Sequence, residues 1–374
     1  MQRLLPWLTG AQPPESPTAR LLLSGLAGVG ALLGGVQLLK ARLHRHHHLS
    51  SLRAPCPVIS VGNLTVGGTG KTPMVCWLAQ HLSATGRRIA VVSRGYRQHS
   101  RSRVTVVADP EGIRLAPPMA ADEAVLLAHA LPGVAILTGA DRPALIRHAL
   151  EQFGCNLILM DDGFHRLDVD RDLDLVLLDA RRPFGNGRVL PGGILREFPS
   201  ALHRCDGIIL TRADDPDATR ATLNALTHRF PDKPLLTAIH RPSAWIPIHP
   251  DGPARPLDAL TGPVLAFCGI GTPEGFQRAL HALPVRLTGF HPFPDHHPFT
   301  PDTLRHLSAL AQSSGAHALV CTEKDAVKLN RAALSLPLFA LRVTMELQHN
   351  RSWLEQRLAF LDRSPSLFTS GQPG

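Results

Sequence analysis

The residues with the clearest chemical potential lie between Pro57 and Cys76, where the sequence reads PVISVGNLTVGGTGKTPMVC. An apolar run ends in a glycine-rich turn, and Lys71-Thr72 then opens an amphipathic segment. Backbone N–H groups of such a turn can converge on an anion, and the dipole of the following helix adds to the attraction. Lys71 can reach the β- and γ-phosphates of a nucleotide, and the Thr72 hydroxyl can ligate Mg²⁺. The stretch therefore predicts a nucleoside triphosphate site, the alternative being an ordinary glycine-rich turn.

The phosphate-binding loop that we predict runs from residue 65 to residue 72. Thr65 stands where the usual P-loop pattern has its first glycine, so the match to that pattern is imperfect. Three closely spaced glycines still leave the backbone open to an anion. The residues assigned to the loop are Thr65, Val66, Gly67, Gly68, Thr69, Gly70, Lys71 and Thr72.

A second candidate group is a pair of carboxylates that follows an apolar run. Residues 157–160 read LILM, and Asp161-Asp162-Gly163 come directly after them. The carboxyl ends of parallel strands face the phosphate loop, so this order is typical of a Walker B segment. Asp161 could hold Mg²⁺ directly or through water, and Asp162 could orient the attacking or transferred group. Carboxylates at strand ends are also common as solvated turn residues, and it is the loop upstream that favours the functional interpretation.

Length and composition restrict the class of protein. At 374 residues the chain is long enough for two domains, and 44% apolar with 18% charged residues excludes wholesale disorder. A formal charge of +9 suits a polyanion, an anionic lipid surface or a phosphorylated substrate. With one tyrosine and no zinc-knuckle spacing, we expect no nucleic-acid partner. The six cysteines form no C-x-x-C pair, which indicates reduced core thiols in a cytoplasmic domain.

An uncharged apolar stretch, LLLSGLAGVGALLGGVQLL, occupies residues 21–39. As a helix it would extend about 28 Å, enough to cross or deeply enter a bilayer. Its glycines dilute the hydrophobicity, so a helix lying in the interface competes with a span, and a buried packing helix is the structural alternative. Lys40, Arg42, Arg45 and Arg53 outnumber the cations upstream, which places the bulk of the chain on the cytoplasmic side.

Beyond the loop, apolar runs alternate with amphipathic segments, which predicts an α/β fold with a mostly parallel sheet sandwiched by helices. The strands expected lie at 88–93, 134–137, 157–160, 173–178, 207–210, 264–268, 318–322 and 338–343. The helices expected lie at 122–131, 142–152, 273–282, 301–312 and 351–361. Pro, His and Trp near residues 242–256 suggest a linker. The resulting division is a membrane-associated helix (1–40), a P-loop core domain (41–245), a smaller α/β domain (246–364) and a disordered tail (365–374).

Seven motifs in this order closely resemble those of the tetraacyldisaccharide 4'-kinase family, which acts in the lipid A pathway of Gram-negative bacteria. They are SVGNLTVGGTGKTP (60–73), SRGY (93–96), DDGF (161–164), LPGGILRE (190–197), GIGTPEGF (269–276), FPDHH (293–297) and TEKDAVKL (322–329). The resemblance spans roughly residues 21–361, and LPGGILRE and TEKDAVKL are far more specific than the phosphate loop. It implies that ATP with Mg²⁺ phosphorylates the 4'-hydroxyl of an acylated glucosamine disaccharide 1-phosphate. We expect a monomer, anchored by its N-terminal helix to lipid at the cytoplasmic face of the inner membrane.

The resemblance also implies roles for acids and a histidine outside the loop. Asp122-Glu123 matches the family's GDEP segment, in which the aspartate is the proposed base and the glutamate assists Mg²⁺; the flanking Gly and Pro are alanines here. Asp295-His296 matches the family's DH pair, and the histidine could hold and tune the base. From the residues alone these would be dipole-favoured helix carboxylates and a loop histidine. The catalytic set predicted is Lys71, Asp122, Asp162 and His296, and the metal set is Thr72, Glu123 and Asp161.

Several positions keep two interpretations. Arg94, Arg196 and Glu197 are candidates for gripping the 1-phosphate or the sugar, since a guanidinium can pair two phosphate oxygens, but each could instead form a structural salt bridge. In TEKDAVKL, Lys324, Asp325 and Lys328 either contact the nucleotide or link the two domains. The family continues DDG with an apolar residue and Gln-His, whereas this chain has Phe164-His165-Arg166, and the histidines at 44 and 46–48 could be interfacial or bind metal.

Two other classes of protein remain as alternatives. One is a P-loop GTPase or metallochaperone, whose guanine-recognition motif the segment 322–325 partly imitates. The other is a membrane-tethered ATP-binding regulator without catalysis, which has no need for the acids and histidine named above.

Overall fold

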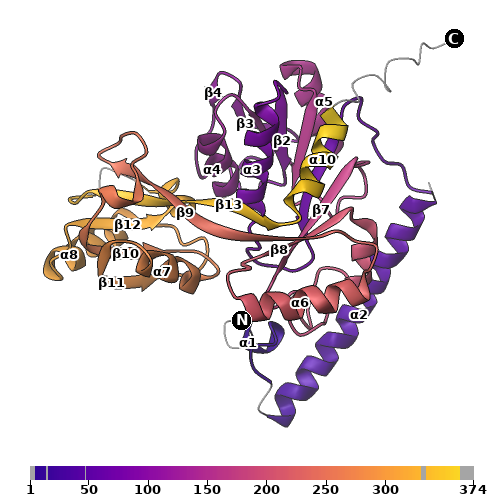
Figure 1. The fold of residues 1–374 in the computed structure, drawn as a ribbon, viewed down its shortest axis with the longest axis horizontal. Coiled ribbons are helices and arrows are strands. Elements are labelled where there is room, and N and C mark those ends of the chain that lie inside the picture. Colours follow the sequence, from indigo (N-terminus) through magenta and orange to yellow (C-terminus); the bar gives the residue numbers. More distant parts are fainter. Residues whose placement is uncertain (1–4, 14–15, 47, 330–333, 363–374) are drawn as a thin grey trace.

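A computed structural model describes residues 5–13, 16–46, 48–329 and 334–362; the tail predicted at 365–374 lies outside them. One 13-stranded sheet runs through these residues, in the order β11-β10-β12-β13-β9-β8-β7-β1-β6-β2-β5-β3-β4 (Figure 1). The strands are β1 Val58–Asn63, β2 Ile89–Ser93, β3 Thr105–Asp109, β4 Gly112–Ile113, β5 Ala135–Thr138, β6 Leu157–Asp161, β7 Leu173–Asp179, β8 Gly207–Thr211, β9 Leu235–His249, β10 Gly262–Cys268, β11 Val285–Pro292, β12 Ala318–Thr322 and β13 Leu338–His349. The helices are α1 Leu5–Leu8, α2 Pro17–Arg45, α3 Lys71–Ser83, α4 Asp122–Ala130, α5 Arg142–Phe153, α6 Pro216–Arg229, α7 Pro273–His281, α8 Pro301–Ser313, α9 Glu323–Ala326 and α10 Arg351–Asp362.

The P-loop half of the molecule contains β1 to β8 and the start of β9. Its central strands pair in parallel and are almost wholly buried, which explains their continuous apolar runs. Helices α3, α4 and α10 cover one face of this part of the sheet, while α5 and α6 cover the other face. The predicted α/β class with a mostly parallel sheet is confirmed.

The second half contains β10 to β13, the end of β9, and α7 to α9. Its strands β10, β11, β12 and β13 pair in parallel, and β9 runs antiparallel to β13. The two long strands β9 and β13 extend through both halves (Figure 1). The linker expected near residues 242–256 is therefore wrong over 242–249, where β9 continues. Pro242 is tolerated there because it sits at a register shift of the β13 ladder, where a missing N–H does little harm.

The C-terminal helix α10 returns to the P-loop half. Its buried Leu354 and Leu358 belong to the same hydrophobic cluster as Met74 and Leu78 of α3. The division into two domains near residue 245 stays a prediction, but α10 is packed against the phosphate-loop side of that boundary.

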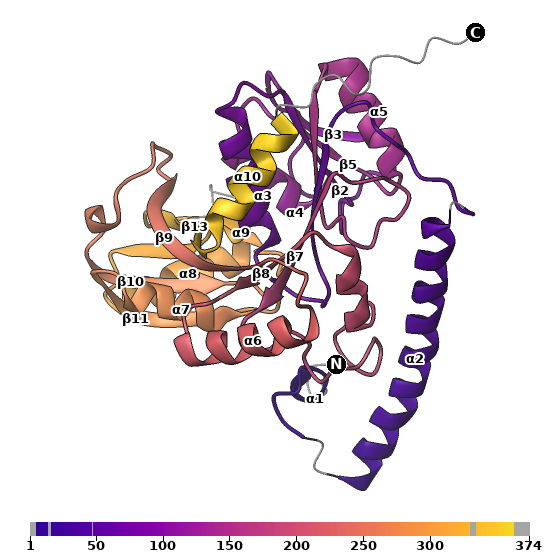
Figure 2. The same cartoon turned by 45° about the vertical axis from the view of Figure 1, so that its right-hand side comes forward.

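Helix α2 lies along one side of the molecule, apart from the sheet (Figure 2). It is 29 residues long, Ser16 caps its N-terminus, and it is long and apolar enough to cross a membrane. Only 17% of its most apolar window is buried, which argues against the buried packing helix considered above. The buried side of the helix contacts the LPGGILRE loop and the residues that flank it: Ala27 lies against Gly192, Gly30 approaches the Val189 carbonyl and Gly34 approaches the Phe198 ring.

Candidate active site

The phosphate loop connects the end of β1 to the first residue of α3, as predicted. Gly67 and Gly70 have φ of 112° and 84°, a left-handed conformation that glycine adopts without penalty, and Gly70 is the N-cap of α3. The LPGGILRE loop holds the start of this turn, because Val66 N–H donates to the Ile194 carbonyl at 2.8 Å. The N-terminus of α3, with Lys71 in its first turn, therefore faces an open concave surface suited to an anion.

The Walker B carboxylates lie on the strand beside β1, with Asp161 in register with Val61. Asp161 is 4% exposed, and its Oδ1 has no hydrogen-bond partner among the described residues. Burial, reinforced by the Glu123 carboxylate, raises the pKa of Asp161 to about 7. A buried, unpartnered carboxylate oxygen beside the Thr72 helix turn fits a divalent cation, whose charge would compensate this burial.

Asp162 is paired with two cations. Arg196 Nη1 contacts both of its carboxylate oxygens at 2.9 and 2.8 Å, and Lys71 Nζ lies 3.6 Å from Oδ1. Burial alone would raise the pKa of Asp162, but Lys71 and Arg196 together lower it to about 2. Asp162 is therefore an anion that fixes the Lys71 ammonium beside the loop.

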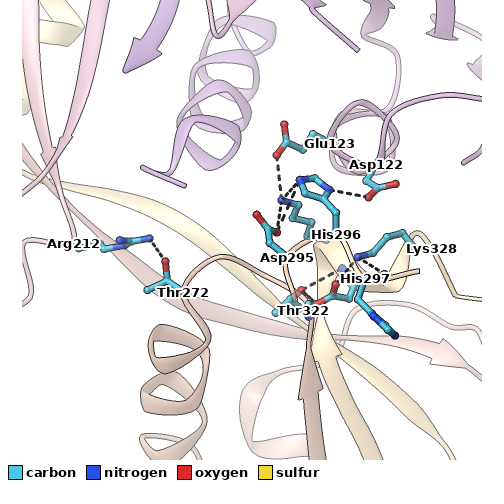
Figure 3. Close-up of polar contacts among 12 residues, drawn as sticks. Asp122, Glu123, Arg212, Thr272, Asp295, His296, His297, Thr322 and Lys328 are labelled. Atoms are coloured by element: carbon cyan, nitrogen blue, oxygen red, sulfur yellow. Dashed lines mark hydrogen bonds and ion pairs between the residues drawn. The ribbon is translucent and has the colours of Figure 1, made fainter. Parts of the chain in front are cut away.

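A cluster of charged side chains joins the two halves (Figure 3). His296, on the loop after β11, places Nδ1 3.3 Å from Asp122 Oδ2 at the start of α4. Its Nε2 lies 3.3 Å from Lys324 Nζ, and Lys324 also reaches Glu123 at 3.3 Å and Asp295 at 3.5 Å. The predicted acids and histidine thus meet across the interface, and Lys324 is a link between the halves.

Two electrical consequences follow from this cluster. Burial alone would raise the pKa of Asp122, but the hydrogen bond with His296 and the charges of Lys328 and Lys324 leave it below the usual value. Since a carboxylate only accepts and an ammonium only donates, Nδ1 of His296 carries the proton toward Asp122 and Nε2 presents a lone pair toward Lys324.

The partial guanine-recognition motif proves to be structural. Asp325 is fully buried, and its carboxylate contacts Gly269 N–H at 2.9 Å, Thr322 Oγ1 at 2.7 Å and Lys328 Nζ at 2.7 Å. A carboxylate used in this way cannot contact a nucleotide base. Asp325 and Lys328 therefore support the fold of the second half.

One cavity of about 1210 Å³ opens between the phosphate loop, the second half and α2. Most of the predicted site residues line it: Val66, Gly67, Gly68, Thr69, Gly70, Lys71, Thr72, Arg94, Glu123, Asp161, Asp162, Arg196, Glu197 and His296. Thr65 and Asp122 are not among the lining residues, since Thr65 is buried against Leu195 and Asp122 contacts the wall through His296. Gln37 and Lys40 of α2 do line the cavity and were not expected; their only sequence signal is a polar i, i+3 pair in an apolar helix.

The three substrate candidates differ in how they are held. Arg196 is committed to Asp162, and Glu197 is buried between His165 and Arg204, at 2.5 and 2.9 Å. The salt-bridge interpretation therefore describes the geometry of both, although both still line the cavity. Arg94 lines the cavity from the SRGY segment that follows β2.

The structure shows the contacts of His165 and Arg166, where this chain departs from the family's motif. His165 places Nδ1 against Glu197 and Nε2 2.8 Å from the Asn63 carbonyl, and Arg166 pairs with Asp168 at 2.5 Å. Within the described part of the chain, no group of three or more His, Cys, Asp or Glu side chains could by itself hold a metal ion, the described histidines near residue 44 included. A cation at Asp161 would therefore need Thr72 and ligand oxygens to complete its shell.

Comparisons with known proteins agree with this geometry. A family model for tetraacyldisaccharide-1-P 4'-kinase matches residues 22–359. The tetraacyldisaccharide 4'-kinases of Anaeromyxobacter dehalogenans and Syntrophus aciditrophicus are 41% and 39% identical, covering 90% and 81% of this chain and 91% and 83% of theirs. The crystal structure of "apo" form LpxK from Aquifex aeolicus in complex with ATP superposes with a TM-score of 0.74 and 28% identity, over 91% of this chain and 99% of that one.

Proposed function

Since the chain belongs to the tetraacyldisaccharide 4'-kinase family, we propose that ATP phosphorylates the 4'-hydroxyl of tetraacyldisaccharide 1-phosphate in the cavity between its two halves. The activity is that of a tetraacyldisaccharide 4'-kinase in lipid A biosynthesis. The observation that carries the proposed site is its composition: the phosphate loop and Walker B acids form one wall, and His296 faces them from the other half.

On the donor side, the loop N–H groups and Lys71 bind the phosphates of ATP. Asp162 holds the Lys71 ammonium in place, while Asp161 and Thr72 are the residues that would hold Mg²⁺. When bound, Mg²⁺ neutralises charge on the phosphate oxygens. We assign Glu123 an assisting role near the metal, with Lys324 keeping it in position 3.3 Å away.

On the acceptor side, the His296–Asp122 pair takes the proton of the sugar hydroxyl. The lowered pKa of Asp122 keeps that carboxylate anionic and makes it a weak proton acceptor at neutral pH. We assign the proton to His296 Nε2, which accepts it once the Lys324 ammonium that donates to it here moves aside; Asp122 holds the ring and stabilises the imidazolium that forms. This division of roles differs from the sequence-based prediction, in which Asp122 itself is the base.

The lipid end of the acceptor belongs near α2. Lys40 of this helix and Arg94 bring positive charge to the cavity wall, and we assign them to the 1-phosphate. The outer side of α2 exposes leucines, which suits contact with inner-membrane lipid at the cytoplasmic face. We expect the protein to act as a monomer.

The test is transfer of labelled γ-phosphate from ATP to tetraacyldisaccharide 1-phosphate by the purified full chain in detergent micelles. We expect labelled lipid from the wild type and from Arg220→Ala, a surface control, and none from Lys71→Ala. Hydrolysis of ATP without labelled lipid would contradict the assignment of the acceptor, and undiminished transfer by Lys71→Ala would contradict the assignment of the loop.

A further inference from the structure

We infer that Thr211 and Arg212, at the carboxyl end of β8, are positioning residues that hold the phosphate loop in its anion-binding form. We further infer that Arg212 couples this loop to the second half through Thr272. The inference rests on the proposed placement of ATP on residues 67–72.

Two side chains from β8 capture the carbonyl groups of the loop. Thr211 Oγ1 donates to the Thr69 carbonyl at 2.9 Å, with the Leu178 carbonyl of β7 as a longer second acceptor at 3.3 Å, and Arg212 Nη2 donates to the Gly68 carbonyl at 2.7 Å. The two pairs with loop carbonyls are separated by more than 140 positions in the chain, so nothing local in the loop sequence indicates them.

Because peptide groups are planar, the two hydrogen bonds to loop carbonyls also fix the direction of the neighbouring loop N–H groups. In a trans peptide the carbonyl of one residue and the N–H of the next point in opposite directions. Holding the carbonyls of Gly68 and Thr69 toward β8 therefore directs the N–H groups of Thr69 and Gly70 away from β8, to the side where an anion binds.

The middle of the loop needs such anchors because Val66, Gly67 and Gly68 are exposed, whereas Thr69 is buried and Gly70 packs against His240. A side chain at Gly67 or Gly68 would meet nothing within 4 Å, so no neighbour braces these residues from that side. Glycine-rich backbone also loses more conformational entropy on ordering than other backbone does. An unanchored loop would have to be ordered by ATP itself, which weakens binding.

Arg212 reaches three parts of the molecule at once. Besides the Gly68 carbonyl, its guanidinium contacts Asp179 at the end of β7 at 2.6 Å. It also contacts Thr272 Oγ1 at 3.1 Å, as Figure 3 shows. Thr272 is the N-cap position of α7 in the second half. Arg212 also has φ of 55°, an uncommon conformation for a non-glycine residue that the surrounding contacts must hold. The order of the loop is thereby linked to the position of the second half.

Thr211 permits a clean test, because it is fully buried and is not among the cavity-lining residues. Any effect of its hydroxyl on ATP must therefore be indirect, and the shorter of its two contacts is the one with the loop. Thr211→Val removes the hydroxyl and keeps the shape, and Thr211→Ser restores the donor. Thr222→Val is the matched control, since Thr222 also donates to a carbonyl, that of Ala180 at 2.7 Å, instead of a loop carbonyl.

The experiment measures the Kd of ATP by calorimetry and the KM of both substrates for the full chain. We expect Thr211→Val and Arg212→Lys to weaken ATP binding about tenfold, with the KM of the lipid acceptor unchanged. Thr211→Ser should bind ATP nearly as the wild type does. So should Thr222→Val and the second control, Arg181→Lys, which changes an arginine that pairs with Asp214 at 2.8 Å. A purely structural role would lower stability and leave these ATP constants unchanged.

The link to the second half is tested with Thr272→Val. We expect a smaller loss of ATP affinity from this change alone and no further loss when it is added to Arg212→Lys, because Arg212→Lys already removes the contact with Thr272. Wild-type ATP affinity in Thr211→Val would overturn the inference. If Thr211→Val does not fold, wild-type ATP affinity in Arg212→Lys would overturn it instead. Should Lys71→Ala also keep full ATP affinity, it is the placement of ATP on the loop, and with it the proposed function, that has failed.

Discussion

His296 makes the two contacts on which the proposed proton transfer depends, one to Asp122 and one to Lys324. We expect His296→Ala to lower kcat by about 10²–10⁴-fold, since a positioned general base contributes that much, with the KM of ATP nearly unchanged. Steady-state kinetics with both substrates varied measures this, and the exposed His306→Ala serves as the control. If His296→Ala keeps the wild-type kcat whereas Asp122→Asn loses it, the base is Asp122.

His240 is a second histidine with a measurable consequence, because its imidazole lies against Gly70 of the loop. Burial, helped by the charge of Arg212, lowers the pKa of His240 to about 4, whereas an unfolded histidine titrates near 6.5. As the pH falls between these values, the unfolded chain takes up a proton that the folded chain does not. The contribution of His240 to stability is therefore complete above pH 6.5 and is lost as the pH falls through 4.

The corresponding experiment compares urea unfolding at pH 7 and pH 5. We expect the wild type to lose on the order of 2 kcal/mol more unfolding free energy than His240→Gln over this interval. His228→Gln, an exposed position on α6, should behave like the wild type. Equal losses in the wild type and His240→Gln would show that the imidazole takes up its proton as readily in the folded chain as in the unfolded one.

At the scale of elements, the contact between α2 and the LPGGILRE loop depends on glycine. A Cβ atom at Gly30 would lie 2.3 Å from the Val189 carbonyl oxygen, whereas one at Gly28 would meet nothing within 4 Å. Gly30→Ala should therefore displace α2 from its contact with residue 189 and lower the free energy of unfolding by about 1–3 kcal/mol. Gly28→Ala, the matched control, should stabilise the helix by about 0.5–1 kcal/mol.

The functional consequence of this contact concerns the acceptor. Lys40 and Leu190 line the cavity from the two sides of the contact, so displacing α2 changes the wall near the lipid. We expect Gly30→Ala to raise the KM of the lipid acceptor and to leave the KM of ATP unchanged. Thermal unfolding and kinetics in micelles measure both effects. If Gly30→Ala keeps the wild-type stability and the wild-type KM of the lipid, the contact between α2 and the LPGGILRE loop does not have the role assigned here.

The strands β9 and β13 are the elements that most restrict the relative placement of the halves. They pair antiparallel over most of their length and carry residues of both halves, and α10 follows β13 back onto the P-loop half. Since the chain crosses between the halves twice within hydrogen-bonded strands, the facing of His296 and the phosphate loop is built into the sheet.

At the scale of the whole molecule, α2 and the cavity share one side. The outer surface of α2 exposes Leu32 at 74% and Val36 at 62%, while Gln37 and Lys40 reach the cavity. This arrangement would present an acyl substrate embedded in a membrane to the site without extracting it fully. We therefore expect the exposed side of α2 to carry most of the membrane affinity.

Substitution of the exposed side tests this orientation without deleting the helix. Leu32→Gln with Val36→Gln should weaken sedimentation with anionic lipid vesicles at least about tenfold, because each apolar side chain contributes about 1.5–3 kcal/mol on burial. The same exchange at Ile113, an exposed position on β4, is the control and should have no effect. Undiminished sedimentation of the double variant would place the membrane contact elsewhere.

The sequence alone was enough to predict those parts of the protein that depend on residues close together in the chain. The strand–loop–helix at residues 58–83 and the acids at the end of β6 follow from glycine conformations, apolar runs and the geometry of parallel strands. The expected strands and helices were found. The elements not foreseen are either very short or of mixed composition without a clean period: α1, α6, α9, β3, β4, β9 and β11. The residues of the interface cluster came from the family resemblance and not from their own pattern.

Tertiary structure alone decided which of these residues touch. Asp122 and His296 are 174 positions apart, and the contacts of Lys324 with Glu123 and of Arg212 with the loop are equally remote in sequence. No periodicity or propensity extends over such distances, because pairing of this kind is fixed by the order of strands in the sheet and by the packing of the halves. The sequence by itself predicted a triphosphate site and its acids; the fold brought a histidine from the far half to the same cavity and hydrogen-bonded the loop carbonyls to Thr211 and Arg212.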